Sequence, residues 1–138
     1  MRRDDPEISF LICVTDLEKA RRFYEAVLEV EARVEGEGVA SCLHLRPSNR
    51  RWEITCVAWP GIHEAAPHLF PAEKPSSFVP GTSLRMYVAD VDAVFARALA
   101  AGGLAVDEPS TREDGVRIGR LRDPEGHLVT LLTRRKRG

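Results

Sequence analysis

The sequence predicts an α+β fold built from two similar βαβββ modules. Two stretches follow one plan, because ISFLICVTDLEKARRFYEAVLEV and TSLRMYVADVDAVFARALAAGG each place a β-rich apolar run, an aspartate and a helical pattern in that order. Each stretch is followed by three short strand-like segments. A chain of 138 residues with 43% apolar and 30% charged residues also has the composition of an ordinary globular domain.

The first module begins with a strand over residues 8–14. Asp16 stands where a helix N-cap is expected, and the apolar residues that follow it recur at helical spacing. They form the stripe Leu17, Ala20, Tyr24, Val27 and Leu28. Three further strands are expected over residues 30–34, 39–45 and 52–58, with turns at 35–38 and 47–50.

The second module repeats this order from residue 82. Asp90 is the expected N-cap, and Gly102-Gly103 ends the helix. The helical stripe consists of Val91, Val94, Phe95, Ala98 and Leu99. Strands are expected over residues 104–107, 116–122 and 127–133. The sequence DPEG at 123–126 predicts a tight turn between the last two.

The whole chain, 1–138, is read as one domain made of modules 5–59 and 82–135. The connection between them, residues 60–81, carries five of the nine prolines and is expected to be irregular. Its two histidines, His63 and His68, leave open a metal pair on a loop, although exposed polar residues are the simpler interpretation.

Charge and cysteine content exclude several classes of partner. The net charge of −1 gives no electrostatic reason to expect nucleic acid, and no apolar run is long enough to cross a membrane. The opening MRRDDPE lacks the apolar stretch of a signal peptide. Three widely spaced cysteines form no CxxC motif, so we expect no disulfide scaffold and a cytoplasmic location. The basic tail RRKR is interpreted as a solvated end.

The doubled plan resembles the vicinal oxygen chelate superfamily, which includes glyoxalases, bleomycin resistance proteins and dioxygenases. The resemblance rests on VTDLEKARRFYEAVLEV in the first module and on YVADVDAVFARALAAGG and GRLRDPEGHLVTLL in the second. The second half is most similar to the PhnB-like subgroup. The resemblance implies curled mixed sheets around a cup that encloses a small molecule, often in a homodimer.

Catalytic members of that superfamily usually hold a divalent metal with His, Gln or Glu from the first and last strands of each module. The corresponding residues of this sequence are Ser9, Glu53, Ser83 and Thr130. Neutral hydroxyls are weak ligands for such metals, and one carboxylate cannot hold the ion by itself. The resemblance therefore predicts that the usual metal site is absent, and no cofactor is expected. A nonstandard set around Glu53 and His44, with Cys42 on the same strand, remains an alternative.

Strand alternation assigns side chains to the cup. Besides apolar positions, the expected ligand-binding residues are Ser9, Cys13, Glu53, Thr55, Trp59, Ser83, Arg85, Tyr87 and Thr130. A mostly apolar surface with a few polar groups is typical of a small-molecule pocket. Arg85 and Glu53 are expected to form an ion pair or to meet a charged ligand. Trp59 is expected either in the core or stacked on a planar ligand, and Cys13 to be an inert thiol.

Three readings of the function follow from these residues. The first is a small-molecule-binding protein that sequesters an organic ligand, such as an antibiotic, without the usual metal site. The alternative is an enzyme, a lyase, isomerase or dioxygenase, that uses a nonstandard metal set or Glu53 as a base. An interaction module for another protein is the third reading, supported only by the basic tail.

Overall fold

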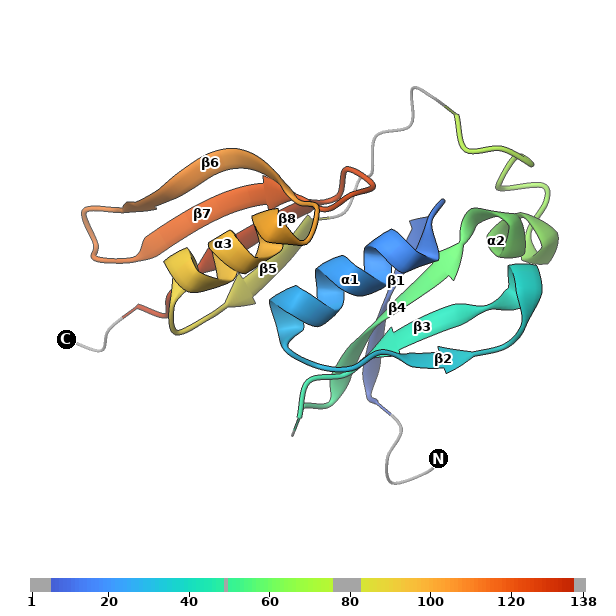
Figure 1. The fold of residues 1–138 in the computed structure, drawn as a ribbon, viewed down its shortest axis with the longest axis horizontal. Coiled ribbons are helices and arrows are strands. Elements are labelled where there is room, and N and C mark those ends of the chain that lie inside the picture. The colour runs from blue at the N-terminus through green and yellow to red at the C-terminus, as the bar shows by residue number, and fades with distance from the viewer. Residues whose placement is uncertain (1–5, 49, 76–82, 136–138) are drawn as a thin grey trace. The chain divides into compact units, whose positions relative to one another are not determined.

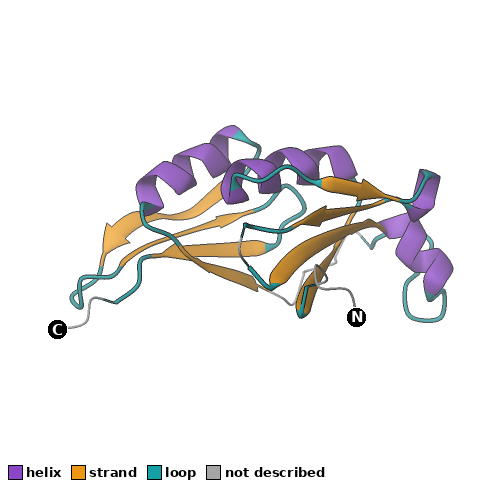
Figure 2. Ribbon diagram, turned by 90° about the horizontal axis from the view of Figure 1, so that it is seen from below, coloured by secondary structure: helices purple, strands orange, loops and turns teal. Residues whose placement is uncertain are grey.

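The computed structural model describes residues 6–48, 50–75 and 83–135, and within them it confirms the α+β fold. The chain separates into two compact units, one before and one from residue 79 (Figure 1). Each unit contains a mixed four-stranded sheet, and a helix covers one face of that sheet (Figure 2). The cup that the two modules would form together stays a prediction. No described helix is long and apolar enough to span a bilayer.

The first unit has the order β-α-β-β-β, as predicted. Its elements are β1 (Ile8–Val14), α1 (Leu17–Leu28), β2 (Arg33–Glu35), the 3-10 helix η1 (Gly38–Ala40), β3 (Cys42–Leu45), β4 (Trp52–Ala58) and α2 (Trp59–Ala65). The strands lie in the order β1-β4-β3-β2, with β1 parallel to β4 and the other pairs antiparallel. The parallel pair is possible because α1 carries the chain from β1 across the sheet.

The second unit repeats this topology with β5 (Ser83–Tyr87), α3 (Val91–Ala100), β6 (Leu104–Thr111), β7 (Arg117–Arg122) and β8 (Leu128–Leu132). Its strand order is β5-β8-β7-β6, and β5 runs parallel to β8. In each unit the last strand in the sequence therefore lies beside the first. This arrangement leaves one face of each sheet uncovered by its own long helix (Figure 2).

Both predicted N-caps are confirmed. The Asp16 carboxylate accepts a hydrogen bond from the backbone N–H of Lys19 at 3.1 Å, and Asp90 accepts one from Ala93 at 3.0 Å. The helices bury most of the predicted apolar stripes, although Leu17, Leu28 and Leu99 are only half-buried and the buried Phe23 was not predicted. In α1 the buried residues are Ala20, Phe23, Tyr24 and Val27, and in α3 they are Val91, Val94, Phe95 and Ala98.

Three predictions about local structure are wrong. The segment after β4 is not irregular throughout, because Trp59–Ala65 forms helix α2. Pro60 lies in the first turn of this helix, where a backbone N–H would have no partner within the helix, so the missing N–H of proline costs nothing. Residues 38–40 form η1 rather than the start of a strand. Glu35, expected in a turn, is the last residue of strand β2. This last difference matters for the site.

The DPEG sequence forms the tight turn that was predicted between β7 and β8. Gly126 has a φ of 95°, which favours glycine, and its backbone N–H donates to the carbonyl of Asp123 at 3.0 Å. The Asp123 side chain lies inside the turn and is 1% exposed. It holds both the backbone and the ring of His127, so that this histidine is structural rather than a ligand.

Candidate functional site in the first unit

A polar network crosses the face of the first sheet that lies opposite α1, which we call the open face. Strand pairing places Ser9 opposite Glu53, and Thr55 opposite both Leu11 and His44. Because residues directly opposite in a sheet point to the same side, these side chains share one face. The sequence predicted Ser9, Glu53 and Thr55 on this face, whereas it left His44 as an alternative.

Glu53 lies at the centre of the network and is 6% exposed. Its Oε1 accepts from Nδ1 of His44 at 3.1 Å and from Oγ1 of Thr55 at 3.4 Å. The Thr55 hydroxyl also shares a hydrogen bond with Ser9 at 2.7 Å. Among the described residues, no hydrogen bond reaches Oε2 of Glu53. This oxygen is therefore the acceptor that the carboxylate can offer to a ligand.

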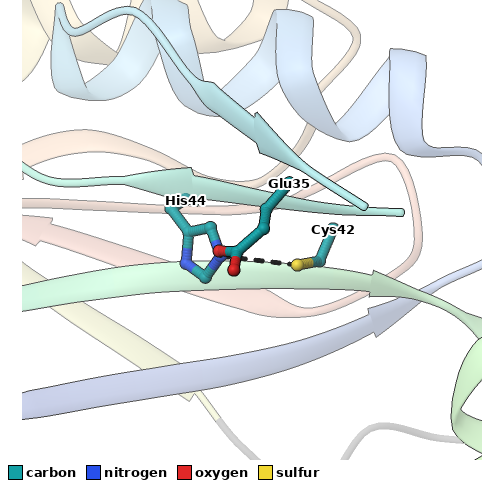
Figure 3. A group of neighbouring side chains, drawn as sticks. All are labelled: Glu35, Cys42 and His44. Carbon is teal, nitrogen blue, oxygen red and sulfur yellow. Dashed lines mark hydrogen bonds and ion pairs between the residues drawn. The ribbon is translucent and has the colours of Figure 1, made fainter. Parts of the chain in front are cut away.

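His44 links Glu53 to a second group of side chains on the same face. Its Nε2 lies 2.8 Å from Oε2 of Glu35 and 3.4 Å from Sγ of Cys42 (Figure 3). Cys42 and His44 alternate along β3, and Glu35 stands directly opposite Cys42 on β2. The imidazole ring thus has one nitrogen directed at Glu53 and the other at Glu35 and Cys42. Because a carboxylate only accepts, Nδ1 is the donor toward Glu53 and Nε2 the donor toward Glu35.

The open face also carries apolar and sulfur-containing side chains. Leu11 is 53% exposed, and Val57 stands between Cys13 and Cys42 in the strand register. All three cysteines are free thiols, and Cys56 is the one that is buried. Apolar surface beside a few fixed polar groups is the character expected of a surface that binds small organic molecules.

Both half-buried thiols of this face have pKa values above the usual value for cysteine. For Cys13 the cause is burial, which outweighs the opposing charge of Lys74. For Cys42 burial again comes first, followed by the negative charge of Glu35. The open face therefore disfavours thiolates, which are the reactive form of cysteine.

We expect Cys13 to react slowly with iodoacetamide at pH 7. A thiol whose pKa is raised holds less thiolate at neutral pH, so the rate should still be rising at pH 9. Mass spectrometry of the alkylated peptide measures this rate, and glutathione is the reference thiol. Alkylation of Cys13 faster than that of glutathione at pH 7 would contradict the assignment of an inert thiol.

Trp59 lies in the core of the first unit. Its side chain is 3% exposed, its indole N–H donates to the carbonyl of Pro71 at 2.9 Å, and its ring packs edge-on against Phe70. The core role is therefore the one that the structure supports, and the ring has little surface left for stacking on a ligand. His63 has a comparable role, because its Nδ1 contacts the carbonyl of Phe70 at 2.7 Å.

The second unit has its own polar row on the face opposite α3. Thr130 on β8 stands between Arg85 on β5 and Arg120 on β7 in the register, and Arg120 donates to Asp107 at 3.2 Å. Ser83, Arg85 and Tyr87 are exposed, and the guanidinium of Arg134 lies over the Tyr87 ring at 5.1 Å. Sequence analysis missed Arg120. Alternation with Ile118 and Arg122 along β7 is the signal that would have found it.

Comparison with known proteins identifies the family to which this arrangement belongs. The sequence profile of the Glyoxalase/Bleomycin resistance protein/Dioxygenase superfamily matches residues 8–131. The chain belongs to this superfamily. No curated protein sequence matches it. The superfamily resemblance inferred from the sequence motifs is thus confirmed.

Solved structures share the fold of this superfamily member. Hypothetical protein SA1046 from S. aureus is 18% identical, with a TM-score of 0.72, and the match covers 97% of this chain and 95% of that one. A glyoxalase-related enzyme from Fulvimarina pelagi is 17% identical, with a TM-score of 0.71 and coverage of 92% and 86%. A glyoxalase/bleomycin resistance protein from Streptomyces sp. CB03234 is 28% identical, with a TM-score of 0.59 and coverage of 90% and 96%.

The residues at the superfamily's usual metal positions do not fit a metal. In the first unit, the Ser9 hydroxyl is hydrogen-bonded to Thr55, and Glu53 is engaged by His44. In the second unit, the two positions hold the hydroxyls of Ser83 and Thr130. Neutral hydroxyls are poor donors to zinc, nickel or iron. We therefore derive no chemistry from a metal at these four positions.

Proposed function

We propose that this protein binds a small organic molecule on the open face of the first sheet, with Glu53 as the anchor. The observation that carries the proposal is a nearly buried carboxylate held by His44 and Thr55 with Oε2 left to accept a hydrogen bond. Such a group recognises an amine, amidine or similar cationic donor, because hydrogen bonds to charged groups are among the strong ones. Leu11 and Val57 would contact the apolar part of the ligand.

Sequestration is the form of this function that the residues favour. Three of the superfamily's four usual metal positions hold hydroxyls, and the polar network leaves Oε2 of Glu53 to accept a hydrogen bond from a ligand. A planar cationic antibiotic is one class of ligand that would fit the carboxylate. The cytoplasmic location and the homodimer belong to the same proposal, and the exposed apolar residues Ile8 and Phe10 of β1 support the dimer.

The second unit carries residues suited to an anionic ligand, whereas Glu53 of the first unit suits a cationic one. Two guanidinium groups, from Arg85 and Arg120, flank Thr130 on one face. We propose that Ser83, Arg85, Tyr87 and Thr130 of this face receive a carboxylate or another oxyanion. Arginine suits this role because its planar group matches the two oxygens of a carboxylate.

A thermal-shift screen of the whole chain tests both preferences. Benzamidine represents planar cations, bleomycin a larger cationic antibiotic, and benzoate small carboxylates. A ligand that binds only the folded protein raises the melting temperature. We expect Glu53→Gln to reduce the benzamidine shift and leave the benzoate shift unchanged. Arg85→Ala should do the opposite. If neither substitution changes any shift, the assignment of these faces is wrong.

One observation favours the enzyme as a second candidate function. The Glu53–His44 hydrogen bond of 3.1 Å is a carboxylate–imidazole pair of the kind that enzymes use in proton transfer. The two functions differ in what happens to the ligand. Mass spectrometry after prolonged incubation should recover a sequestered ligand unchanged, whereas chemical conversion of the ligand would support the enzyme.

A further inference from the structure

The three side chains Glu35, Cys42 and His44 converge on one point of the open face (Figure 3). Their ligand atoms, one carboxylate oxygen, Sγ and a ring nitrogen, all lie within 4.8 Å of one another. We propose that these residues form a binding site for a zinc-type divalent cation. The site lies on β2 and β3, so it is distinct from the superfamily's usual positions at Ser9, Glu53, Ser83 and Thr130.

Two distances between the ligand atoms lie close to those expected for coordination. Zinc binds cysteine sulfur at about 2.3 Å and histidine nitrogen or carboxylate oxygen at about 2.0 Å, in tetrahedral geometry. Ligand atoms around one ion are then about 3.3–3.6 Å apart. Sγ of Cys42 lies 3.4 Å from Nε2 of His44, within this range. Nε2 lies 2.8 Å from Glu35, and the 65% exposed Glu35 side chain can withdraw by the small difference.

A metal-binding histidine usually donates the N–H of its second ring nitrogen to a carboxylate or carbonyl that does not touch the metal, and Glu53 is such an acceptor for His44. It accepts from Nδ1 of His44, which fixes the ring and leaves Nε2 to the metal. Glu53 itself is nearly buried and further held by Thr55. The ring of His44 is therefore already oriented for coordination. This contact is a second observation, beside the convergence of the three ligand atoms.

The ligand types select the kind of ion. One cysteine sulfur, which loses its proton when zinc binds, one imidazole and one carboxylate suit zinc, whereas magnesium and calcium prefer oxygen ligands only. Three protein ligands leave a fourth position for water or a ligand oxygen. The site would therefore have one coordination position that no side chain fills. This inference departs from the expectation of no metal, which considered the usual positions of the superfamily.

Titration of the metal-free chain with cobalt(II) tests the site. Cobalt replaces zinc in such sites, and a cysteine ligand gives a thiolate-to-cobalt absorption band in the near ultraviolet. We expect the band to saturate at one cobalt per chain and to disappear when zinc is added. Cys42→Ser should abolish the band. Cys13→Ser is the matched control, because Cys13 lies in the same row of the same face, and it should leave the band intact.

Cobalt affinity of two carboxylate variants and zinc protection of the unsubstituted protein are two further measurements. Glu35→Gln and Glu53→Gln should each weaken cobalt binding about tenfold or more. In the unsubstituted protein, zinc should protect Cys42 from iodoacetamide and leave Cys13 unprotected, which needs no variant that could misfold. A band that survives Cys42→Ser, or no saturable cobalt binding with no zinc protection of Cys42, would overturn the site.

Discussion

Asp123→Ala should lower the stability of the protein more than any other single substitution of a polar residue that we consider. Oδ1 of Asp123 accepts from the backbone N–H groups of Glu125 and His127, both at 2.9 Å, and Oδ2 accepts from the His127 ring at 2.9 Å. Asp123 is 1% exposed and His127 is also buried. Alanine would leave the buried donors of His127 without their acceptor.

The expected loss is about 3–5 kcal/mol in the free energy of unfolding, because three hydrogen bonds to one buried carboxylate are lost and each hydrogen bond to a charged group contributes about 1.5–3 kcal/mol, not fully additively. A domain of ordinary stability has about 5–15 kcal/mol in all, so the second unit would become marginal. Urea unfolding followed by circular dichroism measures the change. Glu113→Ala, which alters an exposed carboxylate of the same unit, should change stability by less than about 0.5 kcal/mol. A loss below about 1 kcal/mol for Asp123→Ala would show that the turn is held in another way.

Glu53→Gln should have the largest effect on ligand binding. Glutamine keeps the size of the side chain and can still accept from His44, so the fold should be retained. It lacks the negative charge that an amidinium requires. A hydrogen bond to a charged group contributes about 1.5–3 kcal/mol, and each 1.4 kcal/mol is a factor of ten in affinity. We therefore expect benzamidine to bind about 10- to 100-fold more weakly.

Isothermal titration calorimetry of the two proteins measures this difference. Glu31→Gln removes an exposed carboxylate of the same unit and controls for the change in net charge. It should alter the affinity by less than twofold, because exposed charges are screened by salt. Equal affinities of the wild-type and Glu53→Gln proteins would mean that the carboxylate does not touch the ligand.

The fold could be predicted from the sequence because its signals are local. The strand over residues 52–58 has the predicted bounds, and the caps at Asp16 and Asp90 are where the sequence places them. Helix α2 could not be predicted in the same way, because Pro60 was read as a breaker. Proline is also favourable in the first turn of a helix, and only the residues after it decide whether it begins a helix or interrupts one.

The candidate site could be predicted only in part, since it depends on the pairing of strands. Alternation placed Ser9, Glu53 and Thr55 on one face, and it placed Cys42 and His44 together. The position of Glu35 depends on the register between β2 and β3, which the 3-10 helix η1 sets. The turn predicted at residues 35–38 did not define which residues of β2 and β3 pair. A shift of one residue in this pairing turns a side chain to the other face of the sheet. Glu35 was therefore missed.

The most direct test of the account is a map of amide chemical shifts during titration of the whole chain with benzamidine. If the open face of the first sheet is the binding surface, the changes should be largest in β1, β3 and β4, near Ser9, His44 and Glu53. In Glu53→Gln the same changes should need about 10- to 100-fold more benzamidine. Saturable changes confined to the second unit, or no saturable change at all, would contradict the account.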